Sequence, residues 1–132
     1  MNVVDSSGWL EYFADGPNAH FFAVPIEASD PLFVPTVSLY EVFKRVLQDR
    51  NESDALQAIA LMQQRTVIEL SASLALRAAR ISLEQRLPMA DSIILATALT
   101  YEAILWSQDS DFEQTLGVKY IAKQRPGNIG CS

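Results

Sequence analysis

Short apolar runs alternate with longer amphipathic segments along the whole chain. The short runs are typical of buried strands, and strands are expected at 2–4, 32–34 (ending at Pro35), 66–70, 104–106 and 118–122. The segments between them carry apolar residues at helical spacing, most clearly over 39–47. Helices are expected at 6–16, 18–28, 39–47, 55–64, 72–87, 88–101 and 112–116, and a loop at 126–130. Ser6 and Ser7 are expected to cap the first of these helices.

This alternation predicts the class of the fold. Repeated strand–helix–strand units give parallel strands joined by right-handed crossovers, and the helices then cover both faces of the sheet. The expected class is α/β, a three-layer α/β/α sandwich with a central, mostly parallel sheet of about five strands. With 132 residues, the chain is expected to form a single domain over 1–132.

The segment 87–112 concentrates the candidate chemistry. Its helix is apolar or small on nearly every side over 93–99, which indicates a buried helix, yet Asp91 lies at its start. Asp109 and Asp111 follow the next strand, and ligands of open α/β sheets bind at the carboxyl ends of strands. The alternative is that Asp91 caps the helix and the two later aspartates form a capping turn, which this pattern alone favours.

Composition narrows the class of protein. Apolar residues make up 49% and charged residues 20% of the chain, as in ordinary soluble domains. No apolar run approaches the roughly 18 residues of a membrane span, and Asp5 stands where a signal peptide needs basic and apolar residues. The single cysteine, Cys131, excludes a disulfide framework and is expected to be inert. We therefore expect a cytoplasmic protein with no membrane partner.

The formal net charge of −6 bears on the choice of ligand. It argues against a protein that binds nucleic acid through a general basic field. A cluster of carboxylates is a different case, because two like charges about 4 Å apart repel by roughly 4 kcal/mol at an effective dielectric constant of about 20. Such a cluster requires divalent cations, which can bridge an acidic pocket to phosphates. A nuclease therefore remains compatible with the charge.

An acidic metal site is the strongest candidate in the sequence. Asp5 ends the first predicted strand, so it would meet Asp91, Asp109 and Asp111 if the first and fourth strands are neighbours. Hard divalent cations such as Mg²⁺ bind through carboxylate oxygens. There is no glycine-rich phosphate loop, no Cys/His metal spacing, and no serine or cysteine in the context of a nucleophile.

Four segments resemble those of a known family. They are Val3-Val4-Asp5-Ser6-Ser7, Ser38-Leu39-Tyr40-Glu41-Val42, 87–98 and 107–112. In this order and spacing they are similar to a PIN domain, and the size and layout resemble the VapC-type toxin of a type II toxin–antitoxin system. The resemblance implies a metal-dependent endoribonuclease that hydrolyses RNA phosphodiester bonds with Mg²⁺ or Mn²⁺.

The resemblance also implies roles for individual residues. The catalytic, metal-binding carboxylates are then Asp5, Glu41, Asp91 and Asp109, with Asp111 as an auxiliary ligand. Ser7 and Ser107 match positions that steady the carboxylates, although threonine is more usual at the second. Helical periodicity predicts differently for Glu41, because it lies opposite the apolar face of its helix and is expected to be exposed.

Partners and alternatives complete the expectations. The resemblance implies an RNA substrate, a small cognate antitoxin and a homodimer. One alternative is a catalytically silent PIN-like module that binds a partner protein, with acids that are only structural. Another is a phosphoacceptor receiver-like domain, which would need paired acids after the first strand and a lysine at the end of the fifth, where only Lys123 is available. The arginines Arg77, Arg80 and Arg86 are expected to form a solvated face or to flank an RNA groove.

Overall fold

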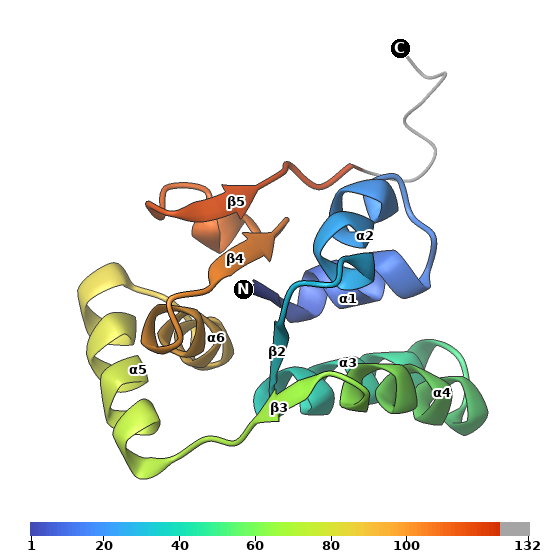
Figure 1. The fold of residues 1–132 in the computed structure, drawn as a ribbon, viewed down its shortest axis with the longest axis horizontal. Helices are drawn as coiled ribbons and strands as arrows, with labels where there is room; N and C mark the ends of the chain where they lie inside the picture. The colour runs from blue at the N-terminus through green and yellow to red at the C-terminus, as the bar shows by residue number, and fades with distance from the viewer. Residues whose placement is uncertain (125–132) are drawn as a thin grey trace.

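A parallel sheet between two layers of helices forms the centre of the molecule (Figure 1). The computed structural model describes residues 1–124, so the loop expected at 126–130 and Cys131 lie outside the described residues. The strands are β1 (Asn2–Val4), β2 (Leu32–Pro35), β3 (Thr66–Ile68), β4 (Ile104–Ser107) and β5 (Val118–Tyr120). The helices are α1 (Ser6–Phe13), α2 (Ala19–Glu27), α3 (Thr36–Asp49), α4 (Glu52–Gln63), α5 (Ala72–Gln85), α6 (Met89–Thr100) and the short 3₁₀ helix η1 (Ser110–Phe112). The predicted three-layer α/β class is confirmed.

The order of the strands places a ligand-binding edge beside β1. The sheet order is β3-β2-β1-β4-β5, and Val3 of β1 pairs with Phe33 on one side and with Leu105 on the other, always in parallel. The chain thus fills the sheet in one direction from β1 and then returns to the other side of β1. This reversal leaves a crevice outside the carboxyl ends of β1 and β4. The order also differs from the 2-1-3-4-5 order of flavodoxin-like sheets, which the receiver-like alternative would require.

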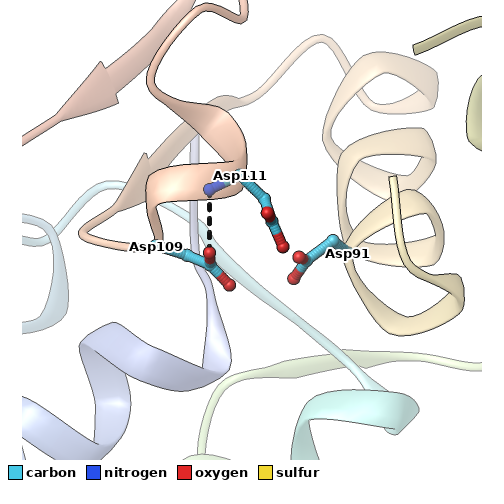
Figure 2. A group of neighbouring side chains, drawn as sticks. All are labelled: Asp91, Asp109 and Asp111. Carbon is cyan, nitrogen blue, oxygen red and sulfur yellow. Dashed lines mark hydrogen bonds between the residues drawn. The ribbon is translucent and has the colours of Figure 1, made fainter. Parts of the chain in front are cut away.

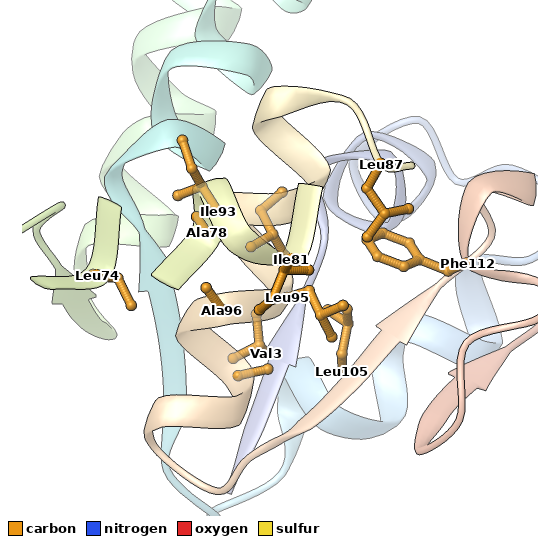
Figure 3. Packing of buried hydrophobic residues seen from close by; sticks show 12 residues of the cluster. Val3, Leu74, Ala78, Ile81, Leu87, Ile93, Leu95, Ala96, Leu105 and Phe112 are labelled. Carbon is orange, nitrogen blue, oxygen red and sulfur yellow. The ribbon is translucent and has the colours of Figure 1, made fainter. Parts of the chain in front are cut away.

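Two hydrophobic clusters lie on opposite faces of the sheet. Successive residues of a strand point to opposite faces, so the neighbours Val3 and Val4 belong to different clusters. The cluster around Val3 joins the sheet to α5 and α6 and includes Leu95 and Leu105 (Figure 3). The cluster around Val4 joins it to α1–α4 and includes Trp9. Because both faces are covered, the short strands are mostly apolar.

Helix α6 is buried along most of its length, as predicted. Residues 91–98 are all buried, and the helix packs against α5, α3 and the sheet. Pro88 precedes its first residue, where a proline fits because its fixed φ suits a helix start. A carboxylate in the first turn of such a helix is therefore held inside the protein. No helix in the described part of the chain is long and apolar enough to cross a membrane.

The structure differs from the prediction at several element ends. The prediction of a helix at 112–116 is wrong. The helix η1 begins two residues earlier and ends at Phe112, whose buried side chain belongs to the cluster around Val3. Strands β3 and β5 are shorter than the predicted runs 66–70 and 118–122. The first helix is capped by Asp5 rather than by the serines that follow it. Packing of Phe112 in the core accounts for the position of η1, and the side-chain cap by Asp5 accounts for the start of α1.

Candidate metal centre

An open cavity of about 330 Å³ lies outside the carboxyl ends of β1 and β4. It is lined by Asp5, Ser6, Ser7, Leu10, Tyr40, Glu41, Lys44, Arg45, Gln48, Asp91 and Asp109. Four of the five carboxylates expected from the sequence thus face one space, although they come from four separate segments of the chain. The fifth, Asp111, lies directly beside Asp91 and Asp109.

Asp5 is the innermost of these carboxylates. It follows β1, is only 2% exposed, and caps α1 by accepting a hydrogen bond from the backbone N–H of Gly8 at 2.9 Å. The hydroxyl of Ser7 donates to the same oxygen at 2.8 Å, and the hydroxyl of Ser107 donates to the other oxygen. Ser107 in turn accepts the backbone N–H of Asp109 at 2.9 Å. Both expected serines therefore fix the orientation of Asp5.

Asp91, Asp109 and Asp111 form a group at the mouth of the cavity (Figure 2). One carboxylate oxygen from each lies within 4.8 Å of the others. Asp109 caps η1 by accepting the backbone N–H of Asp111 at 2.9 Å, so the capping turn predicted as an alternative is present. That hydrogen bond uses one oxygen of Asp109 and leaves the other available. Asp91 is not a cap, because it is the third residue of α6 and Pro88 occupies the cap position.

Glu41 lines the cavity, whereas its helical periodicity predicts an exposed side chain. Its side chain is half-buried and accepts a hydrogen bond of 2.6 Å from the hydroxyl of Ser6. Helix α3 packs against α1, so the side of α3 that looks polar in the sequence faces the start of α1. The pattern-based prediction of a solvent-exposed glutamate is therefore wrong.

The electrostatics of the cluster are unfavourable for the ionised carboxylates. Burial raises the pKa of Asp5 to about 6, and the charge of Asp109 adds to this, while the hydrogen bonds from Ser107, Ser7 and Gly8 act against it. Burial also raises the pKa of Asp91 well above its usual range, with further increases from Asp109, Asp111 and Asp5. Neither ion pair found within residues 1–124 includes any of these acids.

This donor set fits a hard divalent cation. The acidic side chains offer carboxylate oxygens, the ligands that Mg²⁺ and Mn²⁺ prefer, and the described residues offer no Cys/His group there. No lysine or arginine in the described part of the chain forms an ion pair with these carboxylates. A cation of charge +2 would bind these oxygens and would also compensate the negative charge that no side chain of the described range pairs with. It would lower the pKa values that burial raises.

The sequence matches the PIN domain family over residues 3–117. The chain belongs to the PIN domain family. No curated protein matches the sequence. Among solved structures, this PIN domain is similar to a toxin–antitoxin complex from Klebsiella pneumoniae, with a TM-score of 0.71 and 23% identity over 89% of this chain and 95% of that chain.

Two further structures agree with this assignment. The toxin VapC20 of Mycobacterium tuberculosis, described as cleaving the sarcin–ricin loop, has a TM-score of 0.73 and 20% identity over 90% of this chain and 98% of its own. VapBC2 of Rickettsia felis, solved with a fragment of promoter DNA, has a TM-score of 0.68 and 14% identity over 92% of this chain and 97% of its own. At these identities the likeness shows that the PIN domain shares the fold of VapC toxins.

Two supporting residues of this PIN domain have no signal in the sequence pattern. Ser6 was expected only as a cap, yet it positions Glu41, 35 residues away. The buried Gln108 donates to the backbone carbonyl of Ser7 and to the carboxylate of Glu11, both at 3.3 Å, and accepts from Asn18 at 2.9 Å. It thereby ties the end of β4 to α1. These contacts join residues between 35 and 101 positions apart, and no local spacing predicts them.

Proposed function

We propose that this PIN domain is a metal-dependent endoribonuclease that hydrolyses RNA phosphodiester bonds, and that it is the toxin of a toxin–antitoxin pair. The observation that carries the proposal is the meeting of Asp5, Asp91 and Asp109 in one cavity without an ion-pair partner within residues 1–124. Three carboxylates in one cavity repel each other, and such an arrangement is typical of functional sites, where a bound cation or a reaction requires it.

The residues divide into ligands and supports. We assign Asp5, Glu41, Asp91 and Asp109 as the groups that hold Mg²⁺ or Mn²⁺, with Asp111 as an auxiliary. When bound, such an ion neutralises charge on the phosphate oxygens and acidifies the attacking water. The serines Ser7 and Ser107 keep Asp5 oriented through their hydrogen bonds. No side-chain nucleophile is required.

The partners of the protein follow from the same proposal. The similar structures from Klebsiella pneumoniae and Rickettsia felis are toxin–antitoxin complexes, and this supports a small cognate antitoxin for the present chain. The structure named for cleavage of the sarcin–ricin loop supports RNA as the substrate class. We further propose a homodimer in the cytoplasm.

Cleavage of RNA by the purified protein tests the proposal. Total bacterial RNA should be cut in the presence of Mg²⁺ or Mn²⁺, and EDTA should stop the reaction. Asp91→Asn should lower the rate by more than about 100-fold, because even a group that only supports a metal ligand contributes about 10- to 100-fold. Asp30→Asn, an exposed aspartate in the turn before β2, is the matched control and should keep wild-type activity.

Two results would contradict the assignment. An Asp91→Asn protein that still cuts RNA in a metal-dependent way would remove Asp91 from the site. A folded wild type that leaves RNA intact with either metal would favour the catalytically silent protein-binding module. Circular dichroism of each protein keeps loss of folding separate from loss of activity.

A further inference from the structure

One wall of the cavity carries a different chemistry from the carboxylates. Tyr40, Lys44 and Gln48 of α3 are among its lining residues. They are four residues apart, so they lie on one face of the helix, with a rise of about 6 Å between successive members. The Lys44 ammonium lies 5.6 Å from the centre of the Tyr40 ring, within the range of a cation–π contact.

Lys44 is the positive charge of this cavity that is not committed to a carboxylate. Arg45, the other cation in the lining, pairs with Asp49 at 2.7 Å. Lys44 forms no ion pair with any residue of the described range. Arg77 of α5 binds the hydroxyl of Thr100, at the end of α6 opposite to Asp91. The chain has a net charge of −6, yet this cavity holds a lysine that has no ion-pair partner among residues 1–124.

Tyr40 is the most exposed aromatic side chain among residues 1–124, at 63%. The large aromatic side chains of the core are buried, Trp9, Phe22 and Phe112 among them. Tyr40 directly precedes Glu41, which enters the cavity from the same turn of α3. The Tyr40 ring belongs to neither hydrophobic cluster and lines the cavity beside Glu41, so its face is available to a ligand there.

We propose that Tyr40 and Lys44 bind single-stranded RNA next to the bond that is cut, an inference that rests on the proposed ribonuclease function. The Tyr40 ring stacks on an unpaired base, and the Lys44 ammonium binds a phosphate neighbouring the one at the carboxylates. Bases within a duplex are already stacked on each other, whereas an unpaired base can lie on an aromatic ring. The pair therefore selects single-stranded segments of the substrate.

Binding of a 15-nucleotide, fluorescein-labelled, single-stranded RNA of mixed sequence tests this, with fluorescence anisotropy as the readout and Ca²⁺ in place of Mg²⁺. Tyr40→Ala should weaken binding about 10-fold, and Tyr40→Phe should stay within about twofold of the wild type, because it keeps the ring. The same RNA annealed to its complement should bind more weakly and should not distinguish Tyr40→Ala from the wild type. Both side chains at this wall are exposed, so the melting temperatures should remain those of the wild type.

The salt dependence of binding tests Lys44 separately. Lys44→Ala should reduce the slope of log K against log [KCl] by about 0.7, the value for one phosphate contact on a single strand. Lys119→Ala is the matched control: this exposed lysine lies over the Trp106 ring of the sheet and outside the cavity lining, so it should leave the slope unchanged.

A wild type that binds this RNA no more tightly than the Tyr40→Ala/Lys44→Ala double variant would overturn the inference, and the wall would then be assigned to a protein partner. Cleavage of total RNA is scored in parallel. Loss of binding in the variants together with an inactive wild type would contradict the ribonuclease proposal alone. Normal cleavage with unchanged binding in all variants would contradict this inference alone.

Discussion

Asp91 illustrates at the residue scale how a functional group is held at a cost to stability. Its folded-state pKa lies above the unfolded value, because burial and the neighbouring carboxylates disfavour its charge. The folded protein then binds more protons than the unfolded chain between those two pKa values. Stability therefore falls as the pH rises from the unfolded pKa towards the folded pKa, and the loss persists above it.

Asp91→Asn should consequently stabilise the metal-free protein at high pH. We predict a gain of about 1–2 kcal/mol at pH 8 in EDTA, which shrinks towards pH 4 as the wild-type carboxyl becomes protonated. Thermal unfolding of both proteins across this pH range measures the effect, with Asp30→Asn as a control that should show no such trend. A gain that is larger at pH 4 than at pH 8 would contradict the account.

At the scale of elements, the spacing of apolar residues predicted those helices and strands whose form depends on nearby residues in the sequence. The apolar run after Pro88 predicted the buried helix α6, because burial on all sides leaves no polar face in the sequence. The end of η1 and the burial of Glu41 could not be predicted in this way, because Phe112 and Ser6 fix them through contacts distant in sequence. The four aspartates were placed at one edge of the sheet by the predicted strand ends. Glu41 was added by the family resemblance alone, since periodicity assigned it to solvent.

Helix α5 has an outer face that the described residues, 1–124, leave uncovered. Leu76 and Leu83 are 69% and 85% exposed and lie on the side of the helix opposite its buried residues. An antiparallel pairing of two copies would place Leu76 of one against Leu83 of the other. The same pairing would bring Glu84 near Arg77 of the second copy, so this face suits the proposed homodimer.

Leu83→Glu should therefore convert the protein to a monomer, because it would place a carboxylate in an apolar interface. Sedimentation velocity over a range of protein concentrations measures the change. Leu116→Glu is the matched control, since Leu116 is 95% exposed and lies outside α5. A wild type that is monomeric at every concentration, or equal dissociation by both substitutions, would contradict this use of α5.

At the scale of the whole molecule, topology brings the site together. Asp5 follows β1, Glu41 lies on α3, Asp91 lies in the first turn of α6, and Asp109 follows β4. The strand order makes β1 and β4 neighbours. The sequence predicted this convergence only if those two strands are neighbours. They are, because β1 and β4 pair in parallel, with Val4 opposite Trp106. The proposed ribonuclease activity requires that a divalent cation binds where these side chains meet.

Anomalous diffraction from a crystal of the protein soaked in Mn²⁺ tests that claim most directly. We expect a manganese peak bound by oxygens of Asp5, Asp91 and Asp109, at distances of roughly 2.0–2.4 Å, which are those of hard divalent cations on carboxylates. Absence of a peak there, with Mn²⁺ bound only at other carboxylates of the surface, would contradict it.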